Sequence, residues 1–557
     1  MSIQEKSSCG GPRVAIIGGG LGGLSFGIAL KQQLGFEDFT IYEKAAEIGG
    51  TWRDNTYPGC NSDTPSHWYS LSTELNPNWT STCVPGSELQ EYWTHFARKH
   101  ALYEHTVFHT KVVSAGWDSE KQLYNIKLED VRSSTRTFTT AQILISAVGY
   151  LMDPIFPPGL RGLDKFKGDL FHSGRWDHTV DFHNKRVGVV GCGASAAQFI
   201  PILLEDSTVQ MVNFCQTPSW FVDLKITPIS DRQRWIFAHV PFTLRLYRNW
   251  LVITGYILPP YLRRLRGTAH VEEVSTALIK QRAPAQYHDK LIPTYPAACR
   301  RLVMDPGYLA ALHRPNISLN WDGIAEVTED GILTKTGEVI PFDVIIFGTG
   351  FSTDTHPVSI KGTQETLQEY SAAHGGPTAY RGVTVPGFPN FYIIGGPNTT
   401  TPNTSYIFTH EVEINYAIQL VAPVVRGLAS SFEVTARACD AYNAWLQAKI
   451  AGSDWMLCHS WYRTGGNGKN FGIFPGSILQ FWWLLRSPAW GNYTVVGGAR
   501  WEAYQRWIGF ATLGAVASAL VLGGALVRRD LVLRAVESLG AQFVQMSKAI
   551  YHLNAEA

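Results

Sequence analysis

Three glycines near the start of the chain have the spacing of a turn that binds a dinucleotide. Gly18, Gly20 and Gly23 follow a short apolar run and precede a segment with helical spacing. Glycines at these places allow a tight turn and let the backbone approach a pyrophosphate, whose charge the N-terminus of the helix stabilises. Glu43 ends the next apolar run, where a carboxylate accepts hydrogen bonds from the ribose of an adenosine.

A second turn of the same kind lies in the middle of the chain. Gly191, Gly193 and Ala196 repeat the spacing between an apolar run and a helical segment. Two such units in one chain indicate two bound dinucleotides. This arrangement is typical of flavoenzymes that a nicotinamide cofactor reduces.

The elements that position these turns predict an α/β fold with two Rossmann-like dinucleotide-binding domains. Apolar runs that end in glycine, 144–149 and 343–350, fit the places where the chain leaves the first domain and returns to it. The first domain is then discontinuous, comprising residues 11–150 and 340–500, and residues 151–339 form the inserted domain.

The inserted domain contains a connector at residues 155–180 and a helical stretch at residues 224–300. This stretch has an apolar run bounded by arginines that is too short to span a bilayer. It is consistent with a helical lid, with a surface that touches a membrane, or with ordinary core helices.

The connector holds an unusual set of side chains. Phe166, Gly168, His172 and Trp176 lie in the stretch FKGDLFHSGRWDH. With both turns placed, the chain resembles the class B flavoprotein monooxygenases, and this stretch resembles their Baeyer–Villiger signature FxGxxxHxxxW. A further similarity is to the family fingerprint GxWxxxxYPGxxxD, which is matched here by Gly50, Trp52, Tyr57, Pro58, Gly59 and Asp63. The resemblance extends from about residue 13 to at least residue 420.

The resemblance implies FAD in the first domain and NADPH in the second. It also implies that one oxygen atom of O2 is inserted next to a ketone carbonyl, which gives an ester or lactone. In the family the connector allows one domain to rotate against the other, for which a flexible glycine and a packing aromatic residue are suited. His172 is then expected to be a structural hydrogen-bonding residue.

The resemblance also assigns the catalytic pair. The family places an arginine over the flavin, held by an aspartate, and the matching residues are Arg301 and Asp63. Arginine suits this role because it keeps its proton and offers a rigid fork of donors. The alternative for Arg301 is a surface residue in a basic pair with Arg300. The residues expected at the cofactors are Gly18, Gly20, Gly23, Glu43, Gly50, Thr51, Trp52, Asp63, Tyr69, Gly191, Gly193, Ala194, Ser195, Ala196, Gln216 and Arg300.

One residue departs from the family pattern. Where the family has an arginine that binds the 2′-phosphate of NADPH, this chain has Gln216. Glutamine can donate a hydrogen bond to a phosphate but cannot neutralise it, which costs about 1–2 kcal/mol. Arg300 compensates for this loss if NADPH is the reductant, and NADH is the alternative.

Composition narrows the class of protein. The chain has 557 residues and a formal net charge of +1, which does not favour nucleic-acid binding. Its eight cysteines form no CxxC pair and show no metal-ligand spacing, so we expect no metal and reduced thiols in a cytosolic setting. The first residues lack the apolar core of a signal peptide.

Residues 501–557 form a C-terminal tail that contains a candidate membrane anchor. Residues 507–527 are 21 consecutive residues without charge, bounded by Arg506 and Arg528. This length matches one membrane-spanning helix, so we expect a cytoplasmic catalytic region that is anchored at its C-terminus. A buried core helix is the alternative.

The sequence is compatible with three hypotheses for the reaction. A bulky apolar ketone, such as a secondary metabolite, suits the aromatic composition and the anchor. The second hypothesis is hydroxylation or N- or S-oxidation by a hydroperoxyflavin, and the third is a catalytically decayed flavoprotein scaffold at a membrane. Asp63 and Arg301 favour the first, because heteroatom oxidation needs no stabilised carbonyl oxygen.

Overall fold

The computed structural model describes residues 11–223, 225–257, 268–401 and 405–507, together with isolated residues of the C-terminal tail. The chain divides into two compact units. The larger comprises Met1–Val425 and Ser431–Thr494, and the smaller comprises Arg426–Ser430 and Val495–Ala557. All the predicted site residues belong to the larger unit.

A five-stranded parallel sheet forms the centre of the first domain. Its strand order is β19-β7-β1-β2-β3, with β1 (Val14–Ile17) between β7 (Ile143–Ser146) and β2 (Phe39–Tyr42). The outer strands are β3 (Thr106–Val107) and β19 (Phe391–Ile393). Every residue of β1 and β7 is buried, as expected for short apolar strands covered on both faces.

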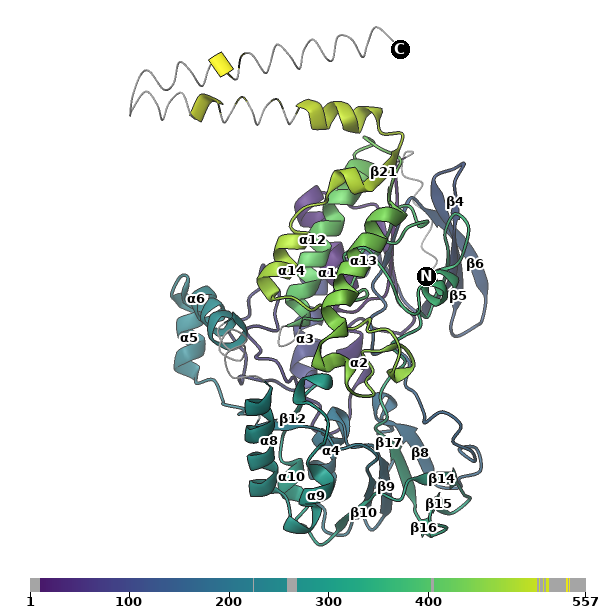
Figure 1. Cartoon of the computed structure of the whole chain (residues 1–557), viewed down its shortest axis with the longest axis vertical. Coiled ribbons are helices and arrows are strands. Elements are labelled where there is room, and N and C mark those ends of the chain that lie inside the picture. The colour runs from purple at the N-terminus through teal and green to yellow at the C-terminus, as the bar shows by residue number, and fades with distance from the viewer. Residues whose placement is uncertain are drawn as a thin grey trace. The chain divides into compact units, whose positions relative to one another are not determined.

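Helices and an antiparallel sheet pack around this centre. α1 (Leu21–Leu34) lies beside α12 (Tyr406–Val425), and α3 (Gly86–Lys99) also contacts α1 (Figure 1). Buried side chains of β1 and β7 join those of the antiparallel sheet in one hydrophobic cluster. That sheet has the order β18-β4-β5-β6, formed by Ser359–Lys361, Thr110–Asp118, Leu123–Asp130 and Arg136–Ala141. Its edge strand β18 pairs with β4 in parallel, and the other pairs are antiparallel.

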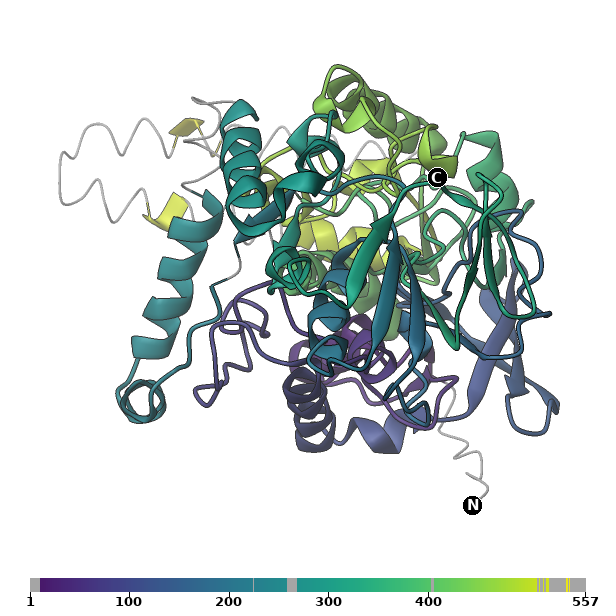
Figure 2. The ribbon, with the colours of Figure 1, turned by 90° about the horizontal axis from the view of Figure 1, so that it is seen from below.

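A second five-stranded parallel sheet forms the inserted domain, so the predicted α/β class is confirmed. Its order is β13-β10-β9-β17-β8, and its strands are Ile317–Asn320, Gln210–Phe214, Arg186–Val190, Val344–Phe347 and Asp169–His172. Figures 1 and 2 show β9, β10 and β17 side by side in this sheet. α4 (Ala194–Leu203) packs into the same core through Ala196, Phe199 and Ile200.

The strand β17 shows where the chain returns to the first domain. Residues 344–347 pair with β8 and β9 of the second sheet. The return therefore follows Phe347, rather than residue 340 as the sequence suggested. An apolar strand that ends in glycine fits either sheet, so the pattern alone could not make this distinction.

The remaining helices and strands are smaller elements. The antiparallel meander β14-β15-β16 consists of Ile324–Val327, Gly331–Thr334 and Val339–Pro341, and packs on the second sheet. The helical stretch contains α5 (Asp231–His239), α6 (Thr243–Val252), η3 (Ile253–Ile257), α8 (Ala269–Arg282), η4 (Ala285–Tyr287), α9 (His288–Leu291) and η5 (Ala297–Cys299). The remaining elements are α2 (Thr51–Asp54), η1 (Leu102–His105), η2 (Ser173–Arg175), β11 (Phe221–Asp223), β12 (Val303–Asp305), α10 (Tyr308–Ala311), α11 (Leu367–Ala373), β20 (Ser431–Val434), α13 (Ala436–Ala451), η6 (Asp454–Met456), η7 (Thr464–Gly466), α14 (Ile478–Leu485), η8 (Trp490–Asn492) and β21 (Tyr493–Val496).

The predicted membrane anchor lies mostly outside the described residues. Between residues 507 and 527, only 507, 510, 514 and 517–519 are described. In the part of the chain that is described, no helix combines the length and apolar character needed to cross a bilayer.

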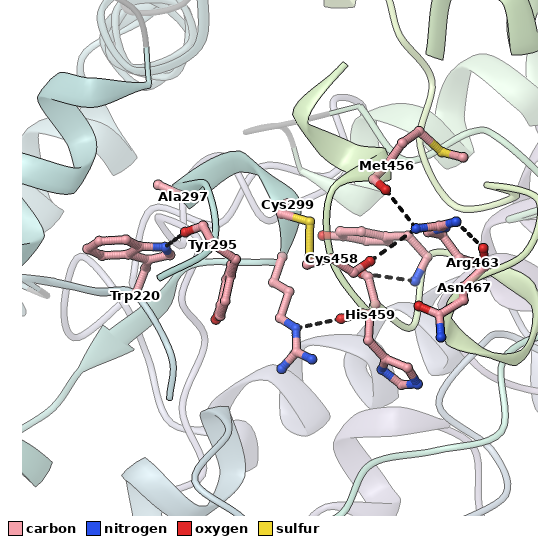
Figure 3. The surroundings of a disulfide bond; sticks show 12 residues. Trp220, Tyr295, Ala297, Cys299, Met456, Cys458, His459, Arg463 and Asn467 are labelled. Atoms are coloured by element: carbon pink, nitrogen blue, oxygen red, sulfur yellow. Dashed lines mark hydrogen bonds between the residues drawn. A yellow bond between two sulfur atoms is a disulfide. The ribbon is translucent and has the colours of Figure 1, made fainter. Parts of the chain in front are cut away.

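The prediction of reduced thiols is wrong for two of the cysteines. Cys299 and Cys458 form a disulfide with a Cα–Cα distance of 6.0 Å (Figure 3). They are 159 residues apart, so only the fold brings them together. Cys60, Cys83, Cys192, Cys215 and Cys439 are free thiols, and Cys9 lies outside the described residues.

Candidate active site

The first turn has the close contacts that require glycine. Gly18 has a φ of +104°, and a Cβ atom there would lie 2.7 Å from the carbonyl oxygen of Ala147. A Cβ atom at Gly23 would lie only 1.9 Å from the carbonyl oxygen of Gly18. Gly20 is the N-cap of α1 and supplies no capping side chain, so the first amides of the helix can bind an anion.

Glu43 lies beside this turn in a fixed orientation. The residue is 4% exposed, and its Oε2 accepts a hydrogen bond of 2.8 Å from the Gly19 amide. Its Oε1 accepts one from the Ala45 amide at 2.9 Å and lies 3.0 Å from Nη1 of Arg53. The ion pair with Arg53 holds the carboxylate at the end of β2, where a ribose would lie.

Residues of the family fingerprint lie next to the first turn. Gly50 has a φ of +55°, and a Cβ atom there would be 2.9 Å from the Cα atom of Gly20. Thr51 and Trp52 begin α2 directly after it. The indole N–H of Trp52 donates to the hydroxyl of Tyr69 at 3.2 Å, and the rings meet edge to face. These residues therefore lie together, although 19 residues separate the first from the last.

The structure brings Arg301 and Asp63 together as an ion pair across 238 residues of sequence. Nη2 of Arg301 donates to Oδ2 of Asp63, and the charge of Asp63 raises the pKa of Arg301 further above its ordinary value. The two side chains keep 44% and 27% of their surface accessible. The guanidinium is therefore a permanent positive charge that an incoming molecule can reach.

Two tyrosines that the sequence analysis did not identify flank this pair. Tyr406 begins α12 and Tyr462 follows η6, and both are close enough to act electrostatically on Arg301. Burial raises the pKa of both phenols, so they remain neutral beside the arginine. No spacing in the sequence links these residues to Arg301, and only the packing of α12 and the 454–473 loop places them there.

The second turn is also built for a close approach. Gly191 has a φ of +112°, and a Cβ atom there would be 2.5 Å from the carbonyl oxygen of Gly348. Within the described part of the chain, no heavy atom lies within 4 Å of a Cβ atom placed at Gly193. Ala194 and Ser195 begin α4 after this glycine, and Ala196 is fully buried.

Gln216 and Arg300 occupy different surroundings. Gln216 follows β10 and is exposed. Nε of Arg300 donates to the carbonyl oxygen of His459 at 2.7 Å, and its guanidinium lies 5.2 Å from the ring centre of Tyr295. The pKa of Cys192, which lies inside the second turn, is lowered by a hydrogen bond with Cys215 and also by the charge of Arg300. Arg300 is therefore a cation within electrostatic reach of this turn.

The connector residues pack between the two domains. Trp176 is 9% exposed, and its ring centre lies 5.2 Å from those of Phe171 and Phe199 and 6.5 Å from that of Tyr57. The hydroxyl of Tyr57 donates to Oε1 of Gln198 on α4 at 2.9 Å. The connector and the fingerprint thus meet on one helix of the second domain.

The other connector residues have local structural contacts. A Cβ atom at Gly168 would lie 2.3 Å from the carbonyl oxygen of Asp343 and 2.8 Å from the ring of Phe166. Nδ1 of His172 accepts a hydrogen bond of 3.0 Å from the Gly174 amide. Burial lowers the pKa of His172 to about 4, so the ring is neutral at physiological pH.

Comparison with known proteins identifies the family. The model described as flavin-binding monooxygenase-like matches residues 11–228. A Baeyer–Villiger monooxygenase of Pseudomonas aeruginosa is 34% identical over 483 residues, which cover 85% of this chain and 89% of that protein. The chain belongs to the Baeyer–Villiger monooxygenases. A second member, from Streptomyces coelicolor, is 34% identical over 480 residues that cover 84% of this chain and 90% of that protein.

The fold of this Baeyer–Villiger monooxygenase agrees with solved structures. The crystal structure of OTEMO in complex with FAD and NADP superposes with a TM-score of 0.77 at 23% identity, covering 87% of this chain and 99% of that chain. As a member of the family, the chain is an NADPH-dependent flavin monooxygenase. The two glycine turns fit such cofactors, because the N-cap residue of the following helix is a glycine in each. With no capping side chain there, the first amides of the helix can bind a phosphate.

Proposed function

We propose that this Baeyer–Villiger monooxygenase oxidises a bulky apolar ketone, with Arg301 as the catalytic cation. The observation that carries the proposal is the ion pair of Arg301 and Asp63, which neutral tyrosines flank. The aromatic rings of Tyr406 and Tyr462 favour an apolar substrate beside a single charge. The bound flavin supplies the oxygen atom, which derives from O2.

The residues of the chain have separate tasks in this proposal. Gly18, Gly20 and Gly23 would hold FAD, with Glu43 as the acceptor for its ribose, and the turn at Gly191 would hold NADPH. Arg301 donates hydrogen bonds to the carbonyl oxygen of the ketone, on which negative charge develops as the carbon is attacked. Asp63 accepts from one nitrogen of the guanidinium and so fixes the direction of the remaining donors.

This arrangement favours ketones over amines and sulfides. An amine or sulfide gives up an electron pair to the incoming oxygen and develops no negative charge that Arg301 could stabilise. A panel of cyclic and long-chain ketones, amines and sulfides tests the proposal, with products separated by chromatography and compared with the NADPH consumed. Ester or lactone from the larger ketones supports it, and oxides of the amines or sulfides as the main products would contradict it.

The reductant preference depends on residue 216, which leads to a prediction. In the variant Gln216→Arg we expect the KM for NADPH to fall roughly 5- to 30-fold, because the new guanidinium pairs with the 2′-phosphate in a charge-assisted bond. The KM for NADH, which lacks this phosphate, should not change. Steady-state oxidation of each reductant measures both constants.

The matched control for this variant is Gln210→Arg. Gln210 is exposed and is the first residue of β10, whereas Gln216 follows the end of this strand. The Gln210→Arg variant therefore adds the same charge at the opposite end of the strand. It should leave both constants unchanged. An equal gain for NADPH in both variants would show a general effect of charge, and no gain with Gln216→Arg would mean that Arg300 already meets the phosphate.

The chain's association with membranes is also part of the proposal. The uncharged stretch 507–527 has the length of a membrane span. In the larger unit, α6 and the residues that flank it carry an exposed apolar stripe of Phe242, Leu246, Trp250 and Ile253. Arg245 is exposed beside this stripe and α6 contains no acidic residue, which suits an anionic lipid surface. Arg248 is buried against Trp68 and Glu411 and does not take part.

The anchor is tested by truncation after Arg506. Trp501 is 7% exposed and its amide donates to the carbonyl oxygen of Leu428, so this truncation keeps that contact. We expect the full chain in the membrane fraction and the truncated chain, with its FAD, in the supernatant after centrifugation. A truncated chain that aggregates without FAD would support the core-helix alternative.

A further inference from the structure

A disulfide joins two segments next to the catalytic cation. Cys299 ends η5 and is followed directly by Arg300 and Arg301. Cys458 lies two residues after η6, in the 454–473 loop that also contains Tyr462. The bond therefore connects the helical stretch of the inserted domain to a loop of the first domain (Figure 3).

A hydrogen bond reinforces the disulfide one residue further along each segment. Nε of Arg300 donates to the carbonyl oxygen of His459 at 2.7 Å. Cys299, Arg300, Cys458 and His459 together form what we call the 299–458 clamp. Arg301 is the next residue after the clamp, so the position of its backbone depends on where the clamp lies.

Hydrogen bonds hold the loop that contains Cys458 in place. Nη1 of Arg463 donates to the carbonyl oxygens of Met456 at 2.8 Å and Cys458 at 3.2 Å, as Figure 3 shows. Nδ2 of Asn398 donates to the carbonyl oxygens of Asn470 at 3.0 Å and Ile473 at 2.8 Å. The loop is thus fixed to the segment that follows β19 in the first domain.

The arginine side is held to the inserted domain at both of its ends. The indole N–H of Trp220 donates to the carbonyl oxygen of Tyr295 at 2.8 Å, and the Val303 amide donates to the carbonyl oxygen of Trp220 at 2.9 Å. Arg301 lies between these two anchors. Within the larger unit, the clamp adds a covalent link from this short segment to the first domain.

We propose that the disulfide of the 299–458 clamp positions Arg301 for oxygen transfer, and that its reduction separates NADPH oxidation from ester formation. The proposal rests on the catalytic role of Arg301 given above. Without the disulfide, the segment is held to the first domain by the Arg300–His459 bond and by the Arg301–Asp63 pair. A partly exposed ion pair contributes little free energy, which is too little to fix the guanidinium alone.

The chemistry of the switch is thiol–disulfide exchange with a dithiol. Cys299 is buried and Cys458 is partly exposed, so we expect a thiolate of the reductant to attack the sulfur of Cys458. The disulfide bond breaks, a mixed disulfide forms at Cys458, and the Cys299 thiolate takes up a proton. The second thiol of the reductant then displaces Cys458, so the dithiol is oxidised to a disulfide and two cysteine thiols are formed. A small-molecule disulfide reverses both steps.

The experiment compares the oxidised, FAD-loaded full chain with the same protein after treatment with dithiothreitol and with the variant Cys299→Ser. Mass spectrometry of alkylated peptides counts the thiols at positions 299 and 458. We expect the reduced protein and the variant to give on the order of 10-fold less ester per NADPH, with more hydrogen peroxide, because small displacements of catalytic groups are costly. Hydrogen exchange of residues 299–303, measured without substrate, should become faster in both.

Cys439→Ser is the matched control, because Cys439 is a buried free thiol on α13. It should resemble the oxidised parent in both measurements. Unchanged ester yield and unchanged exchange after reduction would overturn the proposal, and so would free thiols at 299 and 458 that do not re-form the bond with oxidised glutathione. If Cys299→Ser does not fold, dithiothreitol treatment of the parent decides the outcome. Ester formation by an Arg301→Ala variant within a few-fold of the parent would instead contradict the proposed function, and the hydrogen exchange result would still report on the clamp.

Discussion

Replacing Arg301 with alanine is expected to reduce ester formation by about 10²- to 10³-fold while the enzyme continues to oxidise NADPH. The loss follows from removing the hydrogen-bond donors to the carbonyl oxygen. Deleting one such donor has an effect of about this size in other enzymes. NADPH oxidation continues because the variant leaves both glycine turns intact. Chromatography measures the ester, and absorbance of the reduced nicotinamide measures the oxidation.

Two further variants separate the charge of Arg301 from its geometry. Arg301→Lys keeps the charge but loses the planar fork, so we expect an ester yield between those of the parent and the alanine variant. Arg161→Ala is the matched surface control, since Arg161 is 80% exposed and lies 3.9 Å from its nearest acidic partner, Glu326. It should behave as the parent does. An alanine variant within a few-fold of the parent would mean that another group stabilises the carbonyl oxygen.

The cofactor turns could be predicted from the sequence because their geometry is local. Gly18 and Gly191 both adopt positive φ angles at the end of a buried strand, and a motif of six residues is enough to indicate this. Glu43 could be placed for the same reason, as the end of the next strand. Its salt bridge with Arg53 could not, because that arginine reaches back from α2.

The surroundings of Arg301 could not be predicted, because they are assembled from distant segments. Asp63 was identified only through the family resemblance, and Tyr406 and Tyr462 were not identified at all. The disulfide partner of Cys299 is 159 residues away, and cysteine spacing gave no indication of it. Such contacts depend on how the helical stretch and the 454–473 loop pack against the first domain, which local patterns do not report.

The substitution Gly23→Ala should weaken FAD binding more than a methyl group added at any other glycine of the first turn. Its Cβ atom would lie 1.9 Å from the carbonyl oxygen of Gly18, so α1 must move away from the turn that we propose binds the pyrophosphate. Overpacking of this kind costs about 1–3 kcal/mol, or roughly 5- to 150-fold in affinity. Titration of the apoprotein with FAD measures the Kd, and Gly116→Ala, a site with free space in the described structure, is the control.

The second turn provides the reciprocal experiment, because the corresponding position is already alanine. Ala196 is fully buried. A Cβ atom placed at Gly348 would lie 3.5 Å from the Cβ atom of Ala196, which is an ordinary contact distance. The second turn therefore accommodates a methyl group where the first turn has no room for one, and Ala196→Gly should cost about 1 kcal/mol of stability with little change in the KM for NADPH. If Gly23→Ala bound FAD as tightly as the parent, the close approach of α1 to Gly18 would not be what holds the flavin nucleotide, and the difference between the two turns would have no consequence for binding.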